Sequence, residues 1–363
     1  MKSTMPNNDN SCFSRLAPSF LPSTAVLEMT YRCNHGCLFC SCPWFDDRGT
    51  FDIRPEMSAD QWKSLISRLC TLGIVNIAFT GGEPLLKEHI EEILIHAAGC
   101  ITEHIESKNG QLVSRSAPPK LFLLTNGKIL DDRILDLCAK HQIHLSLSLP
   151  GLKTFTYHTN GGDPHIILDG FKKAKDKGIE TTVGVTVTGR NIHELYETIA
   201  HALIAGADDL LMNRFLPGGR GLRYAAELNL SRPQIPEMLD IAESVLKEAN
   251  RRGHVGTELP KCVFDADKYK NLQVASRCSA ARDFFVIDPS GFTRVCNHSP
   301  VRLNHIDQLE QLKTNPYWKQ FVQKDYLPQM CTGCSLNPHC DGGCREGAHI
   351  LGNDLKAPDP ALV

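Results

Sequence analysis

The chain has 363 residues, of which 42% are hydrophobic and 22% are charged. This composition is ordinary for a folded globular protein and excludes a wholly disordered, collagen-like or coiled-coil chain. The 39 basic and 41 acidic side chains give a formal net charge of -2. The charge therefore favours neither nucleic acid nor a membrane surface as a partner, and we expect neither.

Cysteine is unusually abundant, with 15 residues. An odd number excludes a fully paired disulfide framework within one chain. The first residues lack the charged and then apolar pattern of a secretory signal, and the longest apolar runs, such as 121–125, are far too short to span a bilayer. We therefore expect a reduced, cytoplasmic setting, in which many cysteines indicate metal binding or catalysis.

Residues 1–23 are polar and without period, which predicts a flexible N-terminal arm. Short β-prone apolar runs then alternate with amphipathic helical patterns. The predicted strands are Ala25–Met29, Val75–Phe79, Leu121–Thr125, Ile143–Leu149, Thr182–Thr188 and Asp209–Asn213. The first predicted helix begins at a capping box, Ser58 to Gln61, and the others span 87–98, 131–141, 165–177, 192–205 and 235–252. Glycines that are expected to end helices are Gly73, Gly99, Gly178 and Gly206.

Six strand–helix alternations predict an α/β fold with parallel strands, buried on both faces, and helices packed outside. Six units are too few for an eight-stranded barrel, so we expect a partial barrel or an open sheet over residues 24–225. In either case the active site should lie at the carboxyl ends of the strands. Residues 100–120 interrupt the pattern, and their Asn109-Gly110 pair predicts an inserted hairpin.

The remainder of the chain is organised differently. Residues 226–260 are predicted to be a linking segment with one amphipathic helix. Residues 261–363 contain short segments, turn residues and seven cysteines, and we expect them to form a small second domain. Such a segment is poor in apolar residues, so a metal would be needed to hold it together.

The first cysteine motif is C-x3-C-x2-C, formed by Cys33, Cys37 and Cys40 directly after the first predicted strand. Three thiolates can hold three irons of a [4Fe–4S] cluster and leave the fourth iron without a protein ligand. An open iron can chelate the amine and carboxylate of S-adenosylmethionine. The alternatives are unrelated reduced thiols, or a structural zinc site completed by His35 or Cys42.

Other polar or glycine-rich segments follow the next strands. Gly81-Gly82-Glu83-Pro84 follows the second strand, where glycines allow close approach of the backbone to a ligand and Glu83 offers an acceptor for an ammonium group. Asn126 follows the third strand, and Ser146 and Ser148 lie on the fourth. Each is common in ordinary turns, but all are expected at the same end of the sheet.

With these residues in place, the sequence resembles the radical SAM superfamily over about residues 24–215. The resemblance rests on Cys33, Cys37, Cys40 and Gly81–Pro84. It implies a partial (β/α)6 barrel, a [4Fe–4S] cluster held by those cysteines, and S-adenosylmethionine bound beside it.

The same resemblance implies roles for residues around the cluster. Phe39 would border the adenine, and Glu83 with Gly81, Gly82 and Pro84 would bind the methionine amine. Ser148 or Asn126 would contact the ribose or the carboxylate. Many relatives have an acidic residue after the fourth strand, where this chain has none within 146–151.

The C-terminal cysteines resemble the SPASM extension of some radical SAM enzymes. Their spacing is Cys278-x12-Gly291-x4-Cys296, followed by Cys331-x2-Cys334-x5-Cys340-x3-Cys344. The resemblance implies one or two auxiliary iron–sulfur clusters. The first would use Cys278, Cys296 and Cys344, with Cys262 as a possible fourth ligand, and the second would use Cys331, Cys334 and Cys340.

This chain departs from the SPASM pattern in its last ligand, because no cysteine follows a segment like 357–360. We expect that Asp341, His339, an external ligand or the substrate completes the second cluster, or that one iron stays open. The alternative for the whole segment is a zinc-binding module.

Two arginines follow the sixth strand. Arg214 and Arg220 can hold a carboxylate of substrate or S-adenosylmethionine, or they can be solvated residues of a glycine-rich turn. The remaining cysteines show no ligand spacing, and those within predicted helices should pack as small apolar residues. They are Cys12, Cys42, Cys70, Cys100 and Cys138.

The expected activity is that of a radical SAM oxidoreductase. A ferredoxin or flavodoxin would reduce the first cluster, S-adenosylmethionine would yield a 5′-deoxyadenosyl radical, and that radical would take a hydrogen from the substrate. The auxiliary clusters would accept an electron, relay it or ligate the substrate. The substrate is predicted to be a ribosomally made peptide or a protein. The alternatives are a tetrapyrrole or cofactor-maturing decarboxylase or oxidase, and a non-catalytic iron–sulfur electron carrier or binding module.

Overall fold

The computed structural model describes residues 20–108 and 111–362. Most of the predicted N-terminal arm and the Asn109-Gly110 turn therefore lie outside the described residues. The two sides of that turn are described as strands β3 (Thr102–Lys108) and β4 (Gln111–Ala117), which pair antiparallel as a separate two-stranded sheet. The inserted hairpin is thus confirmed in its strands.

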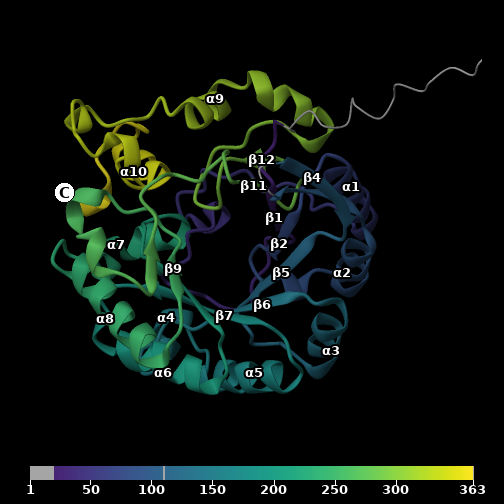
Figure 1. Ribbon diagram of the computed structural model, residues 1–363, viewed down its shortest axis with the longest axis horizontal. Helices are drawn as coiled ribbons and strands as arrows, with labels where there is room; N and C mark the ends of the chain where they lie inside the picture. The colour runs from purple at the N-terminus through teal and green to yellow at the C-terminus, as the bar shows by residue number, and fades with distance from the viewer. Residues whose placement is uncertain (1–19, 109–110, 363) are drawn as a thin grey trace, which may run out of the picture.

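The described residues form one large, mostly parallel sheet that curves round a central space (Figure 1). All six predicted strands are present in it, within one residue or two of their predicted bounds. They are β1 (Thr24–Glu28), β2 (Asn76–Thr80), β5 (Lys120–Thr125), β6 (His144–Ser148), β7 (Thr181–Val187) and β8 (Asp209–Arg214). Each pairs in parallel with the next, in the order β1-β2-β5-β6-β7-β8, so the predicted partial barrel is confirmed.

The helices between these strands lie outside the curve of the sheet (Figure 1). They are α1 (Ala59–Thr71), α2 (Ile90–Gly99), α3 (Asp132–His141), α5 (Pro164–Asp176) and α6 (Leu195–Ala205). The short helix α4 (Phe155–Thr159) instead lies against the predicted iron-binding loop, where Gly36 N donates to Thr159 O at 3.1 Å. The predicted capping box forms: the Ser58 hydroxyl accepts from Gln61 N, and the Gln61 side chain accepts from Ser58 N. One predicted stop is wrong, because α2 includes Gly99 and is capped by Cys100, which takes an extended conformation.

The sheet is larger than predicted, because short strands from the C-terminal part extend both edges. On one edge β9 (Gly253–Val255) pairs with β8, and β10 (Leu272–Val274) pairs with β9. On the other, β11 (Phe284–Ile287) pairs in parallel with β1, and β12 (Thr293–Arg294) pairs antiparallel with β11. Residues after 225 therefore continue the barrel sheet.

The rest of the C-terminal part consists of helices and turns. Helices α7 (Ala225–Leu228) and α8 (Gln234–Ala249) follow β8, and α9 (Pro316–Gln323) and α10 (Arg345–Gly352) lie on the side where the curve of the sheet is open (Figure 1). Most of the predicted ligand cysteines in this region lie on turns or at helix ends. No helix among the described residues is long and apolar enough to cross a membrane.

The expectation that both strand faces are buried is wrong for the inner face. Along β7 buried residues alternate with half-buried ones, and the half-buried ones are Thr182, Gly184 and Thr186. The buried set, such as Val183 and Val185, packs in the main hydrophobic core. Along β7, small and polar residues therefore face the inside of the curve, which leaves room for a cavity there.

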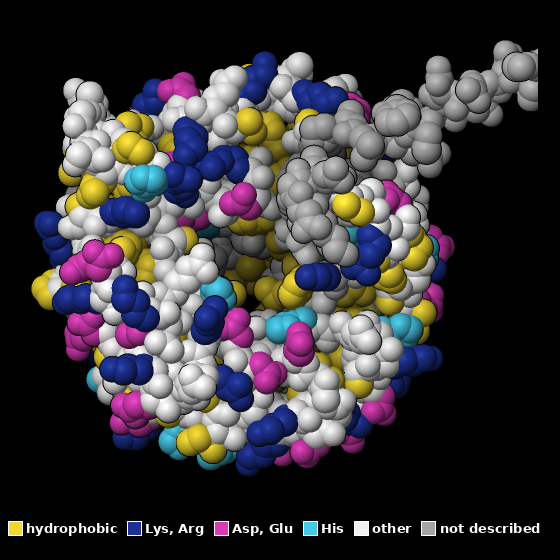
Figure 2. All heavy atoms as spheres, in the orientation of Figure 1, with side chains coloured by type: hydrophobic (Ala, Val, Ile, Leu, Met, Phe, Trp, Pro, Cys, Tyr) yellow, Lys and Arg dark blue, Asp and Glu magenta, His cyan; other side chains and the backbone are white. Residues whose placement is uncertain are grey.

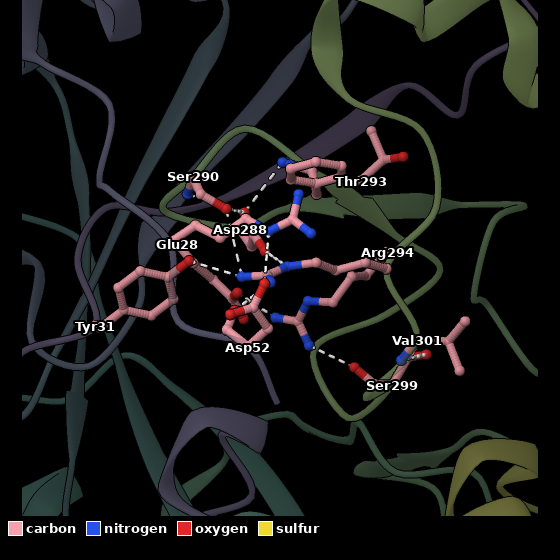
Figure 3. Close-up of polar contacts among 12 residues, drawn as sticks. Glu28, Tyr31, Asp52, Asp288, Ser290, Thr293, Arg294, Ser299 and Val301 are labelled. Atoms are coloured by element: carbon pink, nitrogen blue, oxygen red, sulfur yellow. Dashed lines mark hydrogen bonds and ion pairs between the residues drawn. The ribbon is translucent and has the colours of Figure 1, made fainter. Parts of the chain in front are cut away.

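A buried ion pair joins the end of β1 to the C-terminal part (Figure 3). Glu28 is 2% exposed and pairs with the guanidinium of Arg294, which is fully buried. Arg294 Nη1 also donates to the carbonyl oxygens of Ser299 and Asn297, at 2.6 and 3.1 Å. Burial raises the pKa of Glu28, and the charge of Arg294 opposes that rise.

A second buried network lies beside the first. Arg302 Nε pairs with Asp288 at 2.5 Å, and its Nη2 donates to the Tyr31 hydroxyl at 2.8 Å (Figure 3). Asp288 is fully buried and also accepts from Ser290 N and Phe292 N. Together the two networks fix residues 28–31 to the segment 288–302.

Replacing Glu28 with Gln should destabilise the protein by about 3–5 kcal/mol, because it leaves the buried Arg294 charge without its counterion. The measurement is the free energy of unfolding in denaturant. The matched control is Asp52→Asn, because the Asp52–Arg54 pair is exposed (70% and 46%) and its loss should matter far less. Equal losses in the two variants would contradict the assigned role of the buried pair.

Candidate active site

The predicted iron-binding loop is held against the β2–Gly81 segment by backbone hydrogen bonds. Gly82 N donates to Thr30 O at 2.9 Å, and Glu83 N donates to Arg32 O at 2.8 Å. The approach is close: a Cβ atom on Gly82 would lie 2.1 Å from the Arg32 carbonyl oxygen. Gly81 has a φ of +135°, which favours glycine. The two glycines thus let the chain just before Cys33 pass directly over this turn.

The three thiols of the loop lie close enough to influence one another. All three are free and partly exposed. Burial raises the pKa of Cys37, and negative charge on Cys40 and Cys33 raises it further. The pKa of Cys40 is instead lowered, first by a hydrogen bond from the Cys42 thiol.

The surroundings of the thiols fit an anionic iron–sulfur group. The Asn126 amide nitrogen lies 3.9 Å from Cys33 Sγ, and Arg220 Nη1 donates to the Cys37 carbonyl oxygen at 3.1 Å. Among the described residues, no three His, Cys, Asp or Glu side chains converge on one point as single-ion ligands do. A cluster does not require this, because each of its thiolates binds a different iron.

Glu83 is tied into the site by its own chain. It is fully buried, and its carboxylate accepts from the Thr125 hydroxyl at 2.6 Å, from Asn126 N at 2.9 Å and from Leu85 N at 3.1 Å. Burial raises its pKa. In this arrangement Glu83 joins the ends of β2 and β5. A contact between Glu83 and the ammonium group of a ligand stays a prediction.

The other predicted ligand contacts lie around the same end of the sheet. Asn126 lies beside the loop, where its amide also donates to Asn34 Oδ1 at 2.7 Å. Ser148 is exposed at the end of β6, and Ser146 is half-buried. Pro84 begins a short turn that follows Glu83. The structure thus brings these residues to one edge, as predicted, without testing their roles.

The alternative of solvated arginines is wrong for Arg214, the last residue of β8, and Arg220 is half-buried. Arg214 is 4% exposed, pairs with the buried Asp359 at 2.6 Å, and donates to the Glu258 carbonyl oxygen at 3.1 Å. Arg220 is half-buried and lies over the Phe45 ring, 4.6 Å from its centroid. Both side chains therefore hold parts of this chain together around the site.

A cavity of about 380 Å³ connects the cysteine loop with the first auxiliary set. Its wall includes Phe39 and Cys40 from the loop, and Thr186 and Asn213 from β7 and β8. The auxiliary cysteines that line it are Cys278, Cys296 and Cys344. Figure 2 shows that the middle of this face of the molecule is hollowed. The predicted first auxiliary set therefore opens onto the same space as the predicted catalytic loop.

These three auxiliary thiols are buried together. Burial is the largest of the effects that raise the pKa of these thiols. The pKa of Cys344 is raised to about 12, and those of Cys278 and Cys296 are raised well above the ordinary value. Charge on Cys344 and Cys296 also raises the pKa of Cys278. Thiols in such surroundings are deprotonated when a metal binds them.

Cys262 does not lie with this set. Lys261 N, next to it in the chain, donates to Cys340 Sγ at 3.4 Å, and the charges that raise the pKa of Cys262 after burial come from Cys340 and Cys334. The resemblance gave Cys262 only as a possible fourth ligand of the first set, and the contacts of this turn lie with Cys340 instead. For the predicted second set, charges on Cys340 and Cys334 are among those that raise the pKa of Cys331 after burial, and the ligand role of the three thiols stays a prediction.

Three residues of this cavity were not predicted. Glu258 and Glu346 are 9% and 1% exposed, and charge on them raises the pKa of Cys278 and Cys296 respectively, after burial. His298 also lines the cavity, and burial lowers its pKa to about 4. Glu346 and His298 each lie two residues after a predicted ligand cysteine, a signal that was present in the sequence. Nothing in the spacing points to Glu258.

The cysteines without ligand spacing behave as expected where they are described. Cys70 and Cys138 are buried within α1 and α3, which confirms them as packing residues. Cys42 lies against the first motif, where its thiol donates to Gly81 O at 3.7 Å. His35 is buried and burial lowers its pKa to about 4.

The comparisons with known proteins agree with this geometry. Residues 27–202 match the model of the Radical SAM superfamily. The chain therefore contains a radical SAM domain and is a radical SAM enzyme.

Its sequence is similar over nearly its whole length to proteins named PqqA peptide cyclase. The protein of Rhodopseudomonas palustris is 26% identical over 356 residues, covering 94% of this chain and 87% of the relative. That of Bradyrhizobium diazoefficiens is 24% identical over 358 residues, covering 94% and 86%.

Solved structures share the fold. Streptococcus suis SuiB bound to S-adenosylmethionine has a TM-score of 0.69 at 15% identity, and the match covers 94% of this chain and 77% of that chain. Native anSMEcpe with bound AdoMet has a TM-score of 0.65 at 16% identity, covering 89% of each chain.

Replacing Gly82 with Ala should displace the chain before Cys33, because the added Cβ meets a backbone oxygen that cannot move aside. We expect a loss of about 1–3 kcal/mol of stability and a lower iron content in reconstituted protein. Iron analysis and thermal unfolding measure these effects. Gly99→Ala is the control, because nothing lies within 4 Å of a Cβ there. Unchanged iron binding by Gly82→Ala would contradict the assigned close approach.

Proposed function

We propose that this chain is a maturase that modifies a ribosomally made precursor peptide by radical SAM chemistry. The single observation that carries the proposal is the cavity lined both by Cys40 and Phe39 of the loop and by Cys278, Cys296 and Cys344. A peptide side chain in that cavity lies between the two predicted iron–sulfur sites. The relatives named PqqA peptide cyclase support a peptide as the substrate, as does the SuiB structure bound to its precursor peptide SuiA.

The residues of the loop fit the role of cluster ligands. Cys33, Cys37 and Cys40 would hold the [4Fe–4S] cluster, with Asn126 and Arg220 beside it. When bound, this cluster supplies the electron that breaks a sulfonium bond of S-adenosylmethionine and so gives the radical that takes hydrogen from the substrate. Phe39, Gly81–Pro84 and Ser148 are proposed to border that nucleotide.

The protein's own contribution is to enclose and orient the peptide. The half-buried strand residues Thr186 and Asn213 offer hydrogen-bonding groups to it. His298 is neutral in its buried position, because burial lowers its pKa to about 4, and its Nε2 lies 3.1 Å from the Pro217 carbonyl oxygen, which fixes the ring at the cavity wall. Glu346 is held by the Tyr317 hydroxyl at 2.8 Å and by His349 at 3.1 Å, which fixes its carboxylate near Cys296.

Cross-linking removes two hydrogens from the peptide. One would leave on the deoxyadenosyl carbon, and the other would leave as a proton and an electron. The electron needs an acceptor, and auxiliary iron–sulfur clusters at the C-terminal cysteines are proposed for that role. A cytoplasmic ferredoxin or flavodoxin is the proposed source of the reducing electron.

Replacing Cys33, Cys37 and Cys40 with Ala should abolish the formation of 5′-deoxyadenosine, because the cluster loses all of its protein ligands. Chromatography of the anaerobic reaction with dithionite measures the product, and Cys100→Ser is the control. Product formed at the unaltered rate by the triple variant would overturn the radical SAM assignment. Colourless protein that contains zinc in place of iron and sulfide would overturn it as well.

Co-expression with a candidate precursor peptide should yield peptide that is lighter by two hydrogens for each cross-link. Mass spectrometry with fragmentation measures the loss and places it. The same peptide expressed with the triple Cys→Ala variant should keep its full mass. If active enzyme makes deoxyadenosine but leaves a panel of short peptides unaltered, a peptide substrate is contradicted while the radical chemistry stands.

A further inference from the structure

A short turn, Lys261–Val263, lies against the second cysteine set. Lys261 N donates to Cys340 Sγ at 3.4 Å, and Gly342 N donates to the same sulfur, also at 3.4 Å. Backbone N–H groups directed at a cysteine sulfur are a usual part of iron–sulfur sites, where they stabilise the thiolate. Cys262 thus follows directly after a residue that contacts Cys340, and the two backbone hydrogen bonds to Cys340 Sγ favour its thiolate form.

The electrostatic contacts place the same cysteine in the same group. After burial, charge on Cys340 and on Cys334 raises the pKa of Cys262. At Cys331, the charges that raise the pKa after burial include those of Cys340, Cys334 and Cys262. These contacts agree with the hydrogen bond from Lys261 N to Cys340 Sγ in placing Cys262 near the second set. The charges that act on Cys278 come from another group, Glu258, Cys344 and Cys296.

The other protein ligands considered for the second set are engaged elsewhere. Asp341 is 3% exposed and accepts from Cys278 N and Lys324 Nζ, each at 2.9 Å. It also accepts from Arg282 Nη1 and the Tyr326 hydroxyl, each at 3.2 Å. His339 Nδ1 lies 3.1 Å from Arg277 Nη2. Asp341 would have to give up these partners to bind iron, and at His339 the Nδ1 atom is already in contact with Arg277.

We propose that Cys262 is the fourth ligand of the second auxiliary iron–sulfur cluster, together with Cys331, Cys334 and Cys340. This rests on the auxiliary clusters of the proposed function. Four thiolates complete a [4Fe–4S] cluster, so no iron of this site is open to substrate. The cysteines of the second set do not line the cavity, whereas those of the first set do. Only the first set, Cys278, Cys296 and Cys344, could then bind the peptide directly through an open iron. The second site would transfer electrons or stabilise the fold.

The test is alkylation of the intact, reconstituted holoenzyme under anaerobic conditions, followed by peptide mass spectrometry. Cys262 is exposed, so a free thiol there would react at once, whereas an iron ligand is protected. We expect no label on Cys262 until the iron is removed by a chelator. Cys100, half-buried and outside every set, is the internal control and should react equally with and without iron.

Two variants show which cluster provides the protection. In Cys334→Ala, Cys262 should become reactive, and in Cys278→Ala it should stay protected. Iron and sulfide analysis of Cys262→Ser should show a loss confined to one cluster.

The outcomes separate this inference from the proposed function. Rapid labelling of Cys262 in iron-loaded enzyme that still makes deoxyadenosine overturns the inference alone. Protection that is lost in Cys278→Ala and kept in Cys334→Ala also overturns it, and returns Cys262 to the first set. Zinc in place of iron at the second set overturns it too. Absence of deoxyadenosine formation overturns the proposed function instead.

Discussion

The buried pair of Glu28 and Arg294 sets the relative position of the two halves of the site. Glu28 ends β1, five residues before Cys33, and Arg294 lies on β12, two residues before Cys296. The guanidinium also donates to the carbonyl oxygens of Asn297 and Ser299. Arg294 therefore holds the chain both before and after Cys296. Burying two charges is expensive unless each is the other's partner with its hydrogen bonds satisfied. The contact therefore tolerates little displacement of one cysteine set relative to the other.

The same constraint explains why the cavity lies where it does. Parallel strands place their carboxyl ends at one edge, and the loop after β1 carries the first three thiols there. The pairing of β11 with β1 then brings the 278–296 segment to the same edge, and Arg214 with Asp359 brings the 344–359 segment from the opposite side. The small half-buried residues inside the curve leave the space between them open.

Sequence reasoning predicted the elements whose signal is local. The six strands, the capping box at Ser58 and the cysteine motifs all depend on residues that are close in the chain. Strands β9 to β12 were missed because runs of two to four residues carry no period, and they form only by adding to edges of an existing sheet. The inner strand faces were expected to be buried because a sheet enclosed on both sides is the usual reason for continuous apolar runs.

The site shows the same division between local and distant signals. Cys33, Cys37 and Cys40 share one loop, so their spacing alone brought them together. The resemblance to the SPASM extension made Cys262 a possible ligand beside Cys278, but the fold carries its turn to Cys340, 78 residues later in the numbering. The solvated reading of Arg214 was wrong for a related reason, because its partner Asp359 lies 145 residues later. Spacing cannot reveal partners of this kind, and only the tertiary structure shows them.

Each of the three cysteine sets has an arginine whose positive charge favours the thiolate form of one of its cysteines. Burial raises the pKa of Cys37, of Cys344 and of Cys331, and in each case one arginine opposes that rise: Arg220, Arg214 and Arg345 respectively. Arg345 is fully buried and is held by the carbonyl oxygens of Gly343, Leu355 and Ala357, at 3.1 Å each. Backbone carbonyl oxygens thus stabilise its positive charge without neutralising it, so the charge can still stabilise a nearby thiolate. A buried cation without a carboxylate partner is costly to maintain beside neutral thiols. It becomes favourable beside an anionic group, so the position of Arg345 supports the metal site proposed for the second set. Arg214 already has the carboxylate of Asp359 as its partner, and Arg220 is only half-buried, so the same argument does not extend to them.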